Sequence, residues 1–302
     1  MSLVGCPACR SASFSVHVET PKDREYFVNR AAPAAIVRCS DCRSLYQMPW
    51  PTATETDSFY TSDYQNYITT KAPLVSSLFK WNQRRAARTF IQKNGVKASV
   101  LDFGCNQGFF LRSLYEAGAR SLVGFDVVSP SDPEALSRFR FTSSLESLRD
   151  SGERFDVIRM NHVIEHLADL DAVMKLLASL LTAAGRIIGQ TPNAGHYTSY
   201  LMKAYWGPLH YPYHCLIFSS EGMSEAAKRW GLCLRSTATT IQPTGWAMTV
   251  ENFLKPLTHP KLKGRSPFYA FYLLASLPFV GLDSVTRLSG TAIMDFELAR
   301  SV

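Results

Sequence analysis

One segment in the first half of the sequence constrains the fold most: a largely apolar run, 99–103, leads through a glycine turn into a helix-forming stretch, 108–117. An apolar run that ends in such a turn is typical of a buried parallel strand. Gly104 and Gly108 allow the turn to adopt positive φ angles and to approach a ligand closely. Asp102 is placed to reach that ligand or to fix the turn. The segment predicts the first unit of an α/β sheet.

Strands and helices alternate along the rest of the chain. A helix over 169–181 has apolar residues at i, i+3, i+4 and i+7, and Gly185 follows it as a predicted C-cap glycine. Ser219 or Ser220 is placed to cap a second helix, 219–230. This alternation predicts an α/β fold with a doubly wound sheet. Its further strands are predicted at residues 121–127, 155–160, 186–190, 232–239 and 292–299.

An acidic residue, Asp126, ends the second predicted strand. A carboxylate at that place is positioned to hydrogen-bond a ribose diol. The turn lacks the Gly-x-Gly-x-x-Gly spacing of nicotinamide-binding proteins. Asn106 stands between its glycines, and asparagine tolerates the left-handed region better than most residues. We therefore expect a ribose-containing ligand other than a nicotinamide dinucleotide.

Several blocks of the sequence resemble class I S-adenosylmethionine-dependent methyltransferases. The turn Asp-Phe-Gly-Cys-Asn-Gln-Gly, 102–108, is similar to their first motif, Asp-x-Gly-x-Gly-x-Gly, with Asn106 at the middle glycine. Residues 155–170 and 181–193 resemble the next blocks, and 212–219 resembles a later element more weakly.

This resemblance implies a seven-stranded Rossmann-like methyltransferase sheet that binds S-adenosylmethionine. It implies that Asp126 contacts the ribose, that the glycine loop contacts the amino-acid part, and that Asn161 approaches the same end. It also implies a buried, structural Asp156. The residues expected to bind the cofactor are Asp102, Gly104, Asn106, Gly108, Asp126 and Asn161.

Methyl transfer to a hydroxyl needs a group that removes the proton. His166 is the favoured base, with Glu165 as an orienting or second base and His214 from a later loop. His162 and His166 would share one face if their segment were helical, and His162 is expected to be structural. An unperturbed histidine titrates at about pH 6.5, which suits proton transfer near neutral pH. The alternative is that these histidines only shape the cofactor pocket.

Two Cys-x-x-Cys pairs near the start of the sequence predict a structural zinc site in a small zinc-ribbon module. Four thiolates on two tight turns suit tetrahedral Zn²⁺, and four unligated thiols are the alternative. The expected ligands are Cys6, Cys9, Cys39 and Cys42. A zinc ribbon before such a domain resembles methyltransferases that modify nucleotide-linked sugars. The chain is shorter than the C-methylating members, which argues against C-methylation.

We expect three regions: a zinc-binding ribbon at 1–50, a helical linker or lid at 51–95, and a methyltransferase domain at 96–302 with a helical insertion at about 242–290. In the linker, Tyr60, Tyr64 and Tyr67 either close over the pocket or form a packing face. The apolar stretch from Pro267 to Leu282 follows four basic residues. It predicts either an interfacial membrane segment or a cover over the substrate pocket.

The net charge of +7 is mild for 302 residues and selects no partner class. The start lacks a signal-peptide pattern, and no run is long enough to span a membrane. We therefore expect a cytoplasmic protein, with peripheral contact at the inner face of the membrane as an option. The expected acceptor is a hydroxyl of a sugar or another small polar metabolite. The alternatives are a quinone or lipid precursor at the membrane surface, and an RNA-binding scaffold that uses Lys80–Arg88; a nucleic-acid partner is disfavoured.

Overall fold

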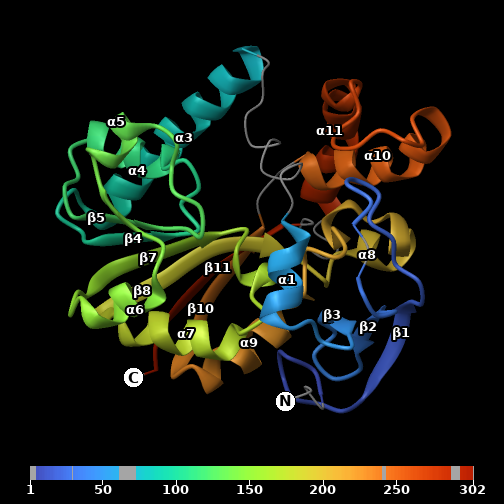
Figure 1. The fold of residues 1–302 in the computed structure, drawn as a ribbon, viewed down its shortest axis with the longest axis horizontal. Coiled ribbons are helices and arrows are strands. Elements are labelled where there is room, and N and C mark those ends of the chain that lie inside the picture. Colours follow the sequence, from blue (N-terminus) through green and yellow to red (C-terminus); the bar gives the residue numbers. More distant parts are fainter. Residues whose placement is uncertain (1–4, 29, 61–72, 240–242, 287–292, 302) are drawn as a thin grey trace.

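A mixed β-sheet forms the centre of the computed structural model, which describes residues 5–301 except 29, 61–72, 240–242 and 287–292. Its strands are β4 (Val100–Phe103), β5 (Leu122–Phe125), β6 (Arg140–Thr142), β7 (Phe155–Asn161), β8 (Leu181–Pro192), β10 (Leu232–Thr239) and β11 (Ile293–Arg300). Their order is β10-β11-β8-β7-β4-β5-β6 (Figure 1). β11 runs antiparallel to both neighbours, and the strands from β8 to β6 pair in parallel. The predicted seven-stranded α/β sheet is confirmed.

Helices cover both faces of this sheet. They are α3 (Pro73–Asn94), α4 (Phe109–Glu116), α5 (Pro133–Leu136), α6 (Leu145–Asp150), α7 (Leu170–Ser179) and α9 (Ser220–Arg229). Successive strand residues point to opposite faces. Val100 therefore packs in a buried cluster with residues of α3 and α4, whereas Leu101 packs in another with residues of α7 and α9. Figure 1 shows these two layers of helices. The doubly wound arrangement is thereby confirmed.

The N-terminal region forms a second, smaller sheet. Its strands are β1 (Phe14–Val18), β2 (Ala35–Cys39), β3 (Leu45–Met48) and β9 (Leu216–Ile217). β9 comes from the second half of the chain and pairs antiparallel with β3. Val37 and Tyr46 belong to the same buried cluster as Leu101 and Trp230. The N-terminal region therefore shares its hydrophobic core with the main sheet.

Further helices lie at the same side of the molecule as the small sheet. They are α1 (Ala53–Phe59), α8 (Tyr197–Met202), α10 (Thr244–Thr258) and α11 (Tyr269–Thr286), with 3-10 turns at Ile164–His166, Lys203–Tyr205 and Gly207–Leu209. Figure 1 shows α10 and α11 together at one corner, above α8. Both fall within the stretch for which a helical insertion is predicted. Tyr64 and Tyr67 lie outside the described residues.

Most predicted elements are confirmed to within a few residues, but one prediction about Gly185 is wrong. α7 ends at Ser179, and Gly185 lies inside β8 rather than at a helix C-cap. A Cβ at Gly185 would lie 2.7 Å from the carbonyl oxygen of Phe155, where the pairing of β7 with β8 shifts register. The glycine allows two backbones to approach closely. β3, β6 and β9 were not predicted, whereas Ser219 is confirmed as the N-cap of α9.

Candidate functional site

The glycine loop between β4 and α4 has the backbone conformation that its residues favour. Gly104, Asn106 and Gly108 have φ angles of +82°, +50° and +68°. A Cβ at Gly104 would lie 2.3 Å from Cγ2 of Val163, and one at Gly108 would lie 2.3 Å from Cζ of Phe139. A side chain at either glycine would therefore push the loop away from its neighbours. Asparagine at 106 adopts the left-handed conformation that the sequence predicts for it.

Asp126 follows β5 and holds the glycine loop in place. Its Oδ2 accepts a hydrogen bond from the backbone N–H of Asn106 at 2.8 Å, and its Oδ1 accepts one from Val128 at 3.2 Å. Burial raises the pKa of the Asp126 carboxyl, and these backbone bonds oppose the shift. Because each carboxylate oxygen has a second lone pair, the group can still accept hydrogen bonds from a diol. The accepting oxygens of Asp126 thus fit the hydroxyl groups of the ribose of S-adenosylmethionine.

Asp102 lies beneath the loop in a buried ion pair that the sequence analysis missed. Its Oδ1 accepts a hydrogen bond from Nη1 of Arg159 at 2.7 Å, and its side chain is 2% exposed. Burial raises the pKa of the Asp102 carboxyl, and Arg159 opposes that shift. Arg159 lies within the apolar strand β7. A single arginine in a buried strand needs a partner of opposite charge, and this was the sequence signal from which the ion pair could have been predicted.

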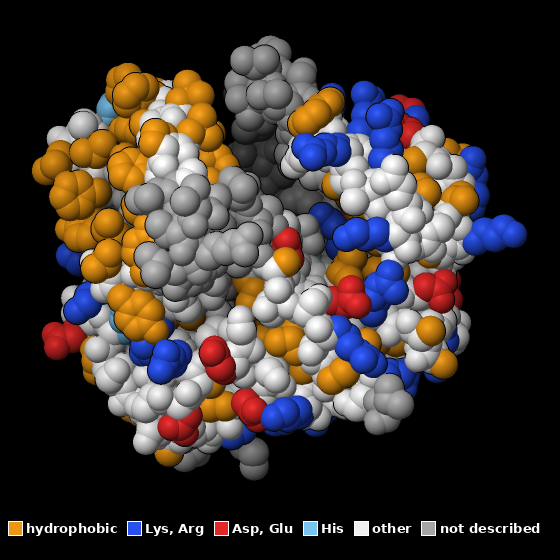
Figure 2. All heavy atoms as spheres, turned by 180° about the vertical axis from the view of Figure 1, so that it is seen from behind, with side chains coloured by type: hydrophobic (Ala, Val, Ile, Leu, Met, Phe, Trp, Pro, Cys, Tyr) orange, Lys and Arg blue, Asp and Glu red, His pale blue; other side chains and the backbone are white. Residues whose placement is uncertain are grey.

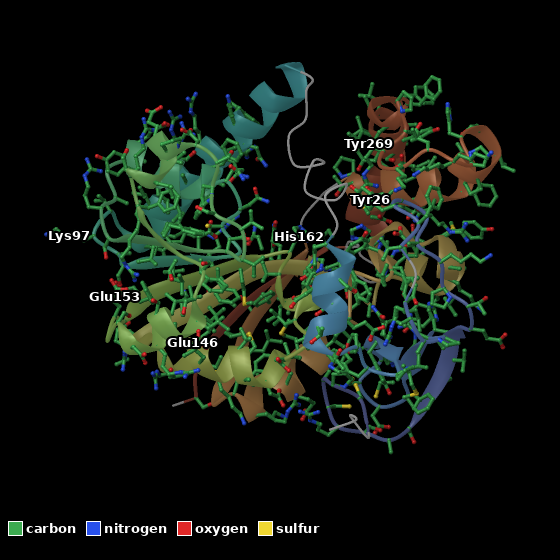
Figure 3. The ribbon with its side chains drawn as sticks, in the orientation of Figure 1. Tyr26, Lys97, Glu146, Glu153, His162 and Tyr269 are labelled. Carbon is green, nitrogen blue, oxygen red and sulfur yellow. The ribbon has the colours of Figure 1, made fainter. Side chains whose placement is uncertain are left out.

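The segment after β7 does not form the helix that would place His162 and His166 on one face. Asn161 ends β7, and its side-chain amide donates to Oε1 of Gln190 at 3.1 Å. His162 has a φ angle of +54°, and only a single 3-10 turn follows it. The His162 side chain is 43% exposed and contacts Glu165, whereas His166 is half-buried. Figure 3 shows His162 between α1 and the ends of the central strands.

Glu165, His166 and His214 converge beside this turn. Each offers one ligand atom, and these atoms lie within 4.8 Å of one another. The rings of the two histidines meet edge to face, with centroids 4.7 Å apart. The turn also meets the glycine loop, because Val163 is the residue that a Cβ at Gly104 would strike. Three of the predicted catalytic side chains are therefore brought together next to the predicted cofactor loop, at a spacing that also suits a divalent cation.

Backbone carbonyls set the tautomers of both histidines. Nδ1 of His166 lies 3.0 Å from the carbonyl oxygen of Tyr213, and Nδ1 of His214 lies 2.8 Å from that of Pro208. A carbonyl oxygen only accepts, so each Nδ1 carries the proton. The lone pair of each ring is then on Nε2. Both imidazoles are thus oriented as proton acceptors through Nε2.

Burial governs the protonation of these three side chains. Burial lowers the pKa of His166 to about 4, although the Glu165 charge opposes this. Burial likewise lowers the pKa of His214 well below its usual value. Burial would raise the pKa of Glu165, but the hydrogen bond with His162 and the nearby imidazoles hold it below its usual value. At neutral pH the cluster has two neutral imidazoles and one carboxylate, and His166 is a weaker base than an ordinary histidine.

Side chains from distant segments complete this side of the site. The Tyr60 hydroxyl lies 2.8 Å from Nδ1 of His166, and Thr191 donates to Oε2 of Glu165 at 3.1 Å. Nε2 of Gln47 donates to the carbonyl oxygens of Pro212 and His214. The sequence suggested a role for Tyr60 only. Thr191 and Gln47 carry no sequence signal, since their contacts depend on how β8 and β3 pack.

The four cysteines of the two Cys-x-x-Cys pairs form a compact cluster. Sγ of Cys6 lies 3.6 Å from Sγ of Cys42, and Sγ of Cys9 lies 3.5 Å from Sγ of Cys39. All four sulfurs are within 4.8 Å of one another, and none is in a disulfide. A tetrahedral site with Zn–S bonds of about 2.3 Å has sulfurs about 3.8 Å apart. The cluster therefore fits a zinc ion.

Comparison with known families decides the class of the protein. The sequence profile of a family described as "Methyltransferase domain" matches residues 75–237. The chain belongs to the methyltransferase-domain family. The matched residues include the glycine loop, Asp126 and the cluster around Glu165. The resemblance to class I S-adenosylmethionine-dependent methyltransferases is thus confirmed for this domain.

Several curated proteins are similar to this methyltransferase domain over part of their length. A ubiquinone biosynthesis O-methyltransferase from Chelativorans sp. is 32% identical over 118 residues, 36% of this chain and 44% of the relative. A tRNA U34 carboxymethyltransferase from Campylobacter hominis is 31% identical over 116 residues, 34% of this chain and 39% of the relative. The chain thus spans less than half the length of these relatives.

Solved structures are similar as well. One is the 1,6-didemethyltoxoflavin-N1-methyltransferase of Burkholderia thailandensis, with 15% identity, 92% of this chain and 100% of that chain covered, and a TM-score of 0.49. Another is a sarcosine dimethylglycine methyltransferase from Galdieria sulphuraria, with 15% identity, 82% and 98% covered, and a TM-score of 0.48.

Proposed function

We propose that the protein transfers a methyl group from S-adenosylmethionine to a hydroxyl of a small molecule. The observation that carries this proposal is the convergence of Glu165, His166 and His214 within 4.8 Å, beside a turn that touches the glycine loop. A cofactor loop supplies the donor, and a buried group of proton acceptors suits a hydroxyl acceptor. The curated relatives named O-methyltransferases agree with an oxygen acceptor.

The cofactor would lie across the carboxyl ends of β4 and β5. Asp126 would accept from its ribose, and the loop from Gly104 to Gly108, with Asn106, would hold its amino-acid part. Asp102 would add its carboxylate from below, and Asn161 would approach the same end from β7. When bound, this cofactor supplies an electrophilic methyl group on a sulfonium.

The acceptor proton would pass to Nε2 of His166. Its Nδ1 is already protonated, and the Glu165 carboxylate would stabilise the imidazolium that forms. A weak base is sufficient, because a hydroxyl oxygen becomes strongly acidic as its bond to the methyl carbon forms. Nε2 of His214 offers a second acceptor for the same proton. His162, which is partly exposed, would serve by positioning Glu165.

For the acceptor itself we propose a hydroxyl of a sugar, and a quinone or lipid precursor as the second candidate. The sugar follows from the combination of a zinc ribbon with this domain. The second candidate follows from the apolar face of α10 and α11, described below, and agrees with the names of several relatives.

We also propose that Cys6, Cys9, Cys39 and Cys42 hold one structural zinc. In this proposal the 1–50 region is a zinc ribbon, 51–95 a helical linker, and 96–302 the methyltransferase domain. The ion would fix β2 and β3, and β3 pairs with β9 directly after His214. The ribbon would in this way position one wall of the acceptor side.

A mass-shift screen tests the proposed reaction. The full chain would be incubated with S-adenosylmethionine carrying a deuterated methyl group, together with nucleotide-linked sugars in one arm and hydroxylated quinone precursors in the other. We expect an O-methylated product in one arm, which the His166→Ala variant forms at least 100-fold more slowly. A product methylated on nitrogen or carbon would overturn the hydroxyl acceptor, as would transfer at full rate by the variant.

A further inference from the structure

Helix α11 is apolar on nearly all sides, yet only a narrow stripe of it is buried. Tyr272, Ser276 and Val280 are buried at four-residue spacing, which is one face of a helix. The remaining faces expose Phe271 by 65% and Leu274 by 67%. A helix that is hydrophobic all round is normally covered by protein or lipid. The exposed faces of α11 therefore point to a partner.

The exposed side chains of α10 and of the loop before α11 extend the same surface. We call the whole surface the apolar face. Figure 2 shows it as the group of hydrophobic side chains at the corner where α10 and α11 lie. Isolated exposed apolar residues are ordinary, but a contiguous group marks an interaction site. Its large members are Phe253, Leu257, Phe268, Phe271, Leu274, Leu277 and Phe279.

The exposed charges beside the apolar face are positive and lie in the loop between α10 and α11. Between residues 252 and 282 the sequence has no aspartate or glutamate and four lysines and arginines, of which Lys255 is buried and Arg265 is paired with Glu25 and Glu251. Lys261 and Lys263 are exposed in the loop between the two helices. An apolar surface with a basic rim is complementary to an anionic lipid surface, because the headgroups attract the cations while the apolar side chains enter the acyl boundary. A second copy of this chain would bring like charges together.

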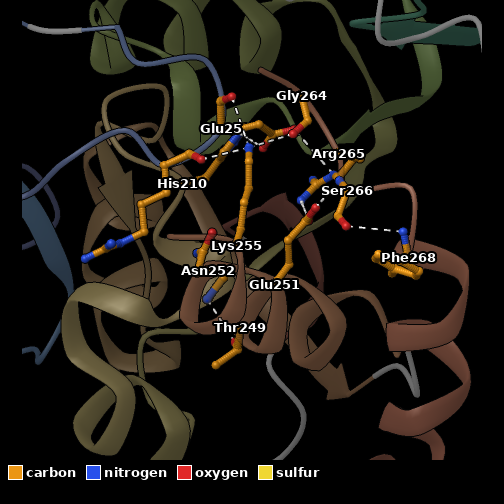
Figure 4. Close-up of polar contacts among 12 residues, drawn as sticks. Glu25, His210, Thr249, Glu251, Asn252, Lys255, Gly264, Arg265, Ser266 and Phe268 are labelled. Carbon is orange, nitrogen blue, oxygen red and sulfur yellow. Dashed lines mark hydrogen bonds and ion pairs between the residues drawn. The ribbon is translucent and has the colours of Figure 1, made fainter. Parts of the chain in front are cut away.

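A buried polar network holds the apolar face rigidly against the rest of the protein (Figure 4). Nζ of Lys255, on α10, donates to the carbonyl oxygens of Arg24 at 2.9 Å and Gly264 at 2.7 Å. Arg265 makes ion pairs with Glu25 at 3.3 Å and Glu251 at 3.0 Å. This network fixes the loop between the helices as well as α10, so the apolar side chains are presented on a fixed surface.

The apolar face is also connected to the acceptor side of the site. The backbone N–H of Gly207 donates to Oγ1 of Thr249, on α10, at 2.9 Å. Its neighbour Pro208 accepts the hydrogen bond from Nδ1 of His214. One 3-10 turn thus lies between α10 and a proposed catalytic histidine. If α10 and α11 bind a membrane surface, a substrate dissolved in that membrane would lie close to His214.

We propose that the apolar face binds the surface of a membrane that contains anionic lipids. No helix among the described residues is long and apolar enough to cross a membrane, so α10 and α11 would lie on the surface. The apolar side chains would enter the acyl boundary, and Lys261 and Lys263 would contact the headgroups. This contact does not depend on which acceptor is methylated.

Vesicle flotation of the full-length protein tests this proposal. We expect the protein to float with vesicles of phosphatidylcholine and phosphatidylglycerol, and much less with phosphatidylcholine alone. The double variant Phe271→Ser/Leu274→Ser should stay in the soluble fraction. Trp81→Ser is the matched control. It removes a 59% exposed side chain from α3, which lies away from α10 and α11 (Figure 1), and it should float like the wild type. Unchanged binding of S-adenosylmethionine would show that each variant is folded.

The double variant Lys261→Gln/Lys263→Gln tests the basic rim. We expect binding to anionic vesicles to weaken about 30-fold, because each cation near such a surface adds about 1 kcal/mol. Absence of flotation by the wild type would overturn the proposal, as would flotation that neither double variant changes. Sedimentation showing a dimer that Phe271→Ser/Leu274→Ser dissociates, without any vesicle binding, would assign the face to a second copy instead.

Discussion

The two sides of the proposed site, one for the cofactor and one for the acceptor, are built in different ways. On the cofactor side, the Asp126 carboxylate accepts hydrogen bonds from the backbone N–H groups of Asn106 and Val128, and the whole unit spans 25 residues, 104–128. On the acceptor side, His166 contacts Tyr60 and Tyr213, which lie 106 and 47 residues away. The first side depends on local backbone geometry, and the second on how separate regions pack. A substitution on the acceptor side should therefore lower turnover without lowering cofactor affinity, and a substitution on the cofactor side should lower cofactor affinity.

The largest expected effect is on the acceptor side, in the His166→Ala variant. Removing the proton acceptor should lower turnover about 10²–10⁴-fold while the affinity for S-adenosylmethionine stays within about twofold. Rates would be measured on the acceptor found in the mass-shift screen, with the surface variant Glu153→Ala as the control. If His166→Ala and His214→Ala both keep full turnover, no protein base is needed and positioning alone accounts for catalysis.

Removal of zinc should also affect the acceptor side selectively. In the Cys39→Ser variant we expect loss of the ribbon, because a closed thiolate site contributes directly to folding. β9 would lose its pairing with β3, and turnover should fall by at least tenfold. Metal analysis should give about one zinc per chain in the wild type, and calorimetry should still detect cofactor binding in the variant. A metal-free wild-type protein of normal stability would refute the zinc site.

Acid should destabilise the acceptor side through its buried histidines. The pKa of His166 is lowered to about 4, so between pH 6.5 and pH 4 the unfolded chain binds a proton that the folded protein does not. The free energy of unfolding should therefore decrease by about 3 kcal/mol over this range from His166 alone. Urea denaturation at pH 6.5 and at pH 4 measures this decrease. His166→Asn should reduce this decrease, and an identical pH dependence in both proteins would contradict the lowered pKa of His166.

The smallest expected effect is that of Tyr60→Phe. The Tyr60 hydroxyl and the Tyr213 carbonyl both accept from Nδ1 of His166. Loss of the hydroxyl should therefore destabilise the catalytic orientation of the His166 ring by about 0.5–1.5 kcal/mol. We expect turnover to fall about two- to tenfold and cofactor affinity to remain unchanged. Ser58→Ala, two residues earlier on the exposed side of α1, is the control. A loss of cofactor affinity in Tyr60→Phe would mean that α1 belongs to the cofactor side.

The sequence predicted the strand β4 and the conformation of the glycine loop well because their determinants are local. The two glycines and Asn106 act through their own backbone preferences, and Asp126 lies close enough in sequence to bond the loop. The acceptor side was predicted only as a set of residue types. The pairing of β9 with β3, the Gln47 bonds to the loop before β9 and the burial that lowers the pKa of His166 all depend on long-range packing. The prediction for Gly185 was wrong for the same reason. This position needs a glycine because the pairing of β7 with β8 shifts register there, which the local sequence does not reveal.

Titration of S-adenosylmethionine into four proteins tests the separation of the two sides most directly. Calorimetry would compare the wild type with Asp126→Ala, His166→Ala and the surface control Glu153→Ala. Asp126→Ala should bind about 5- to 150-fold more weakly, since a hydrogen bond to a charged group contributes about 1–3 kcal/mol. His166→Ala and Glu153→Ala should bind like the wild type. Unchanged affinity in Asp126→Ala, or an equal loss in His166→Ala, would contradict a site with two independently built sides.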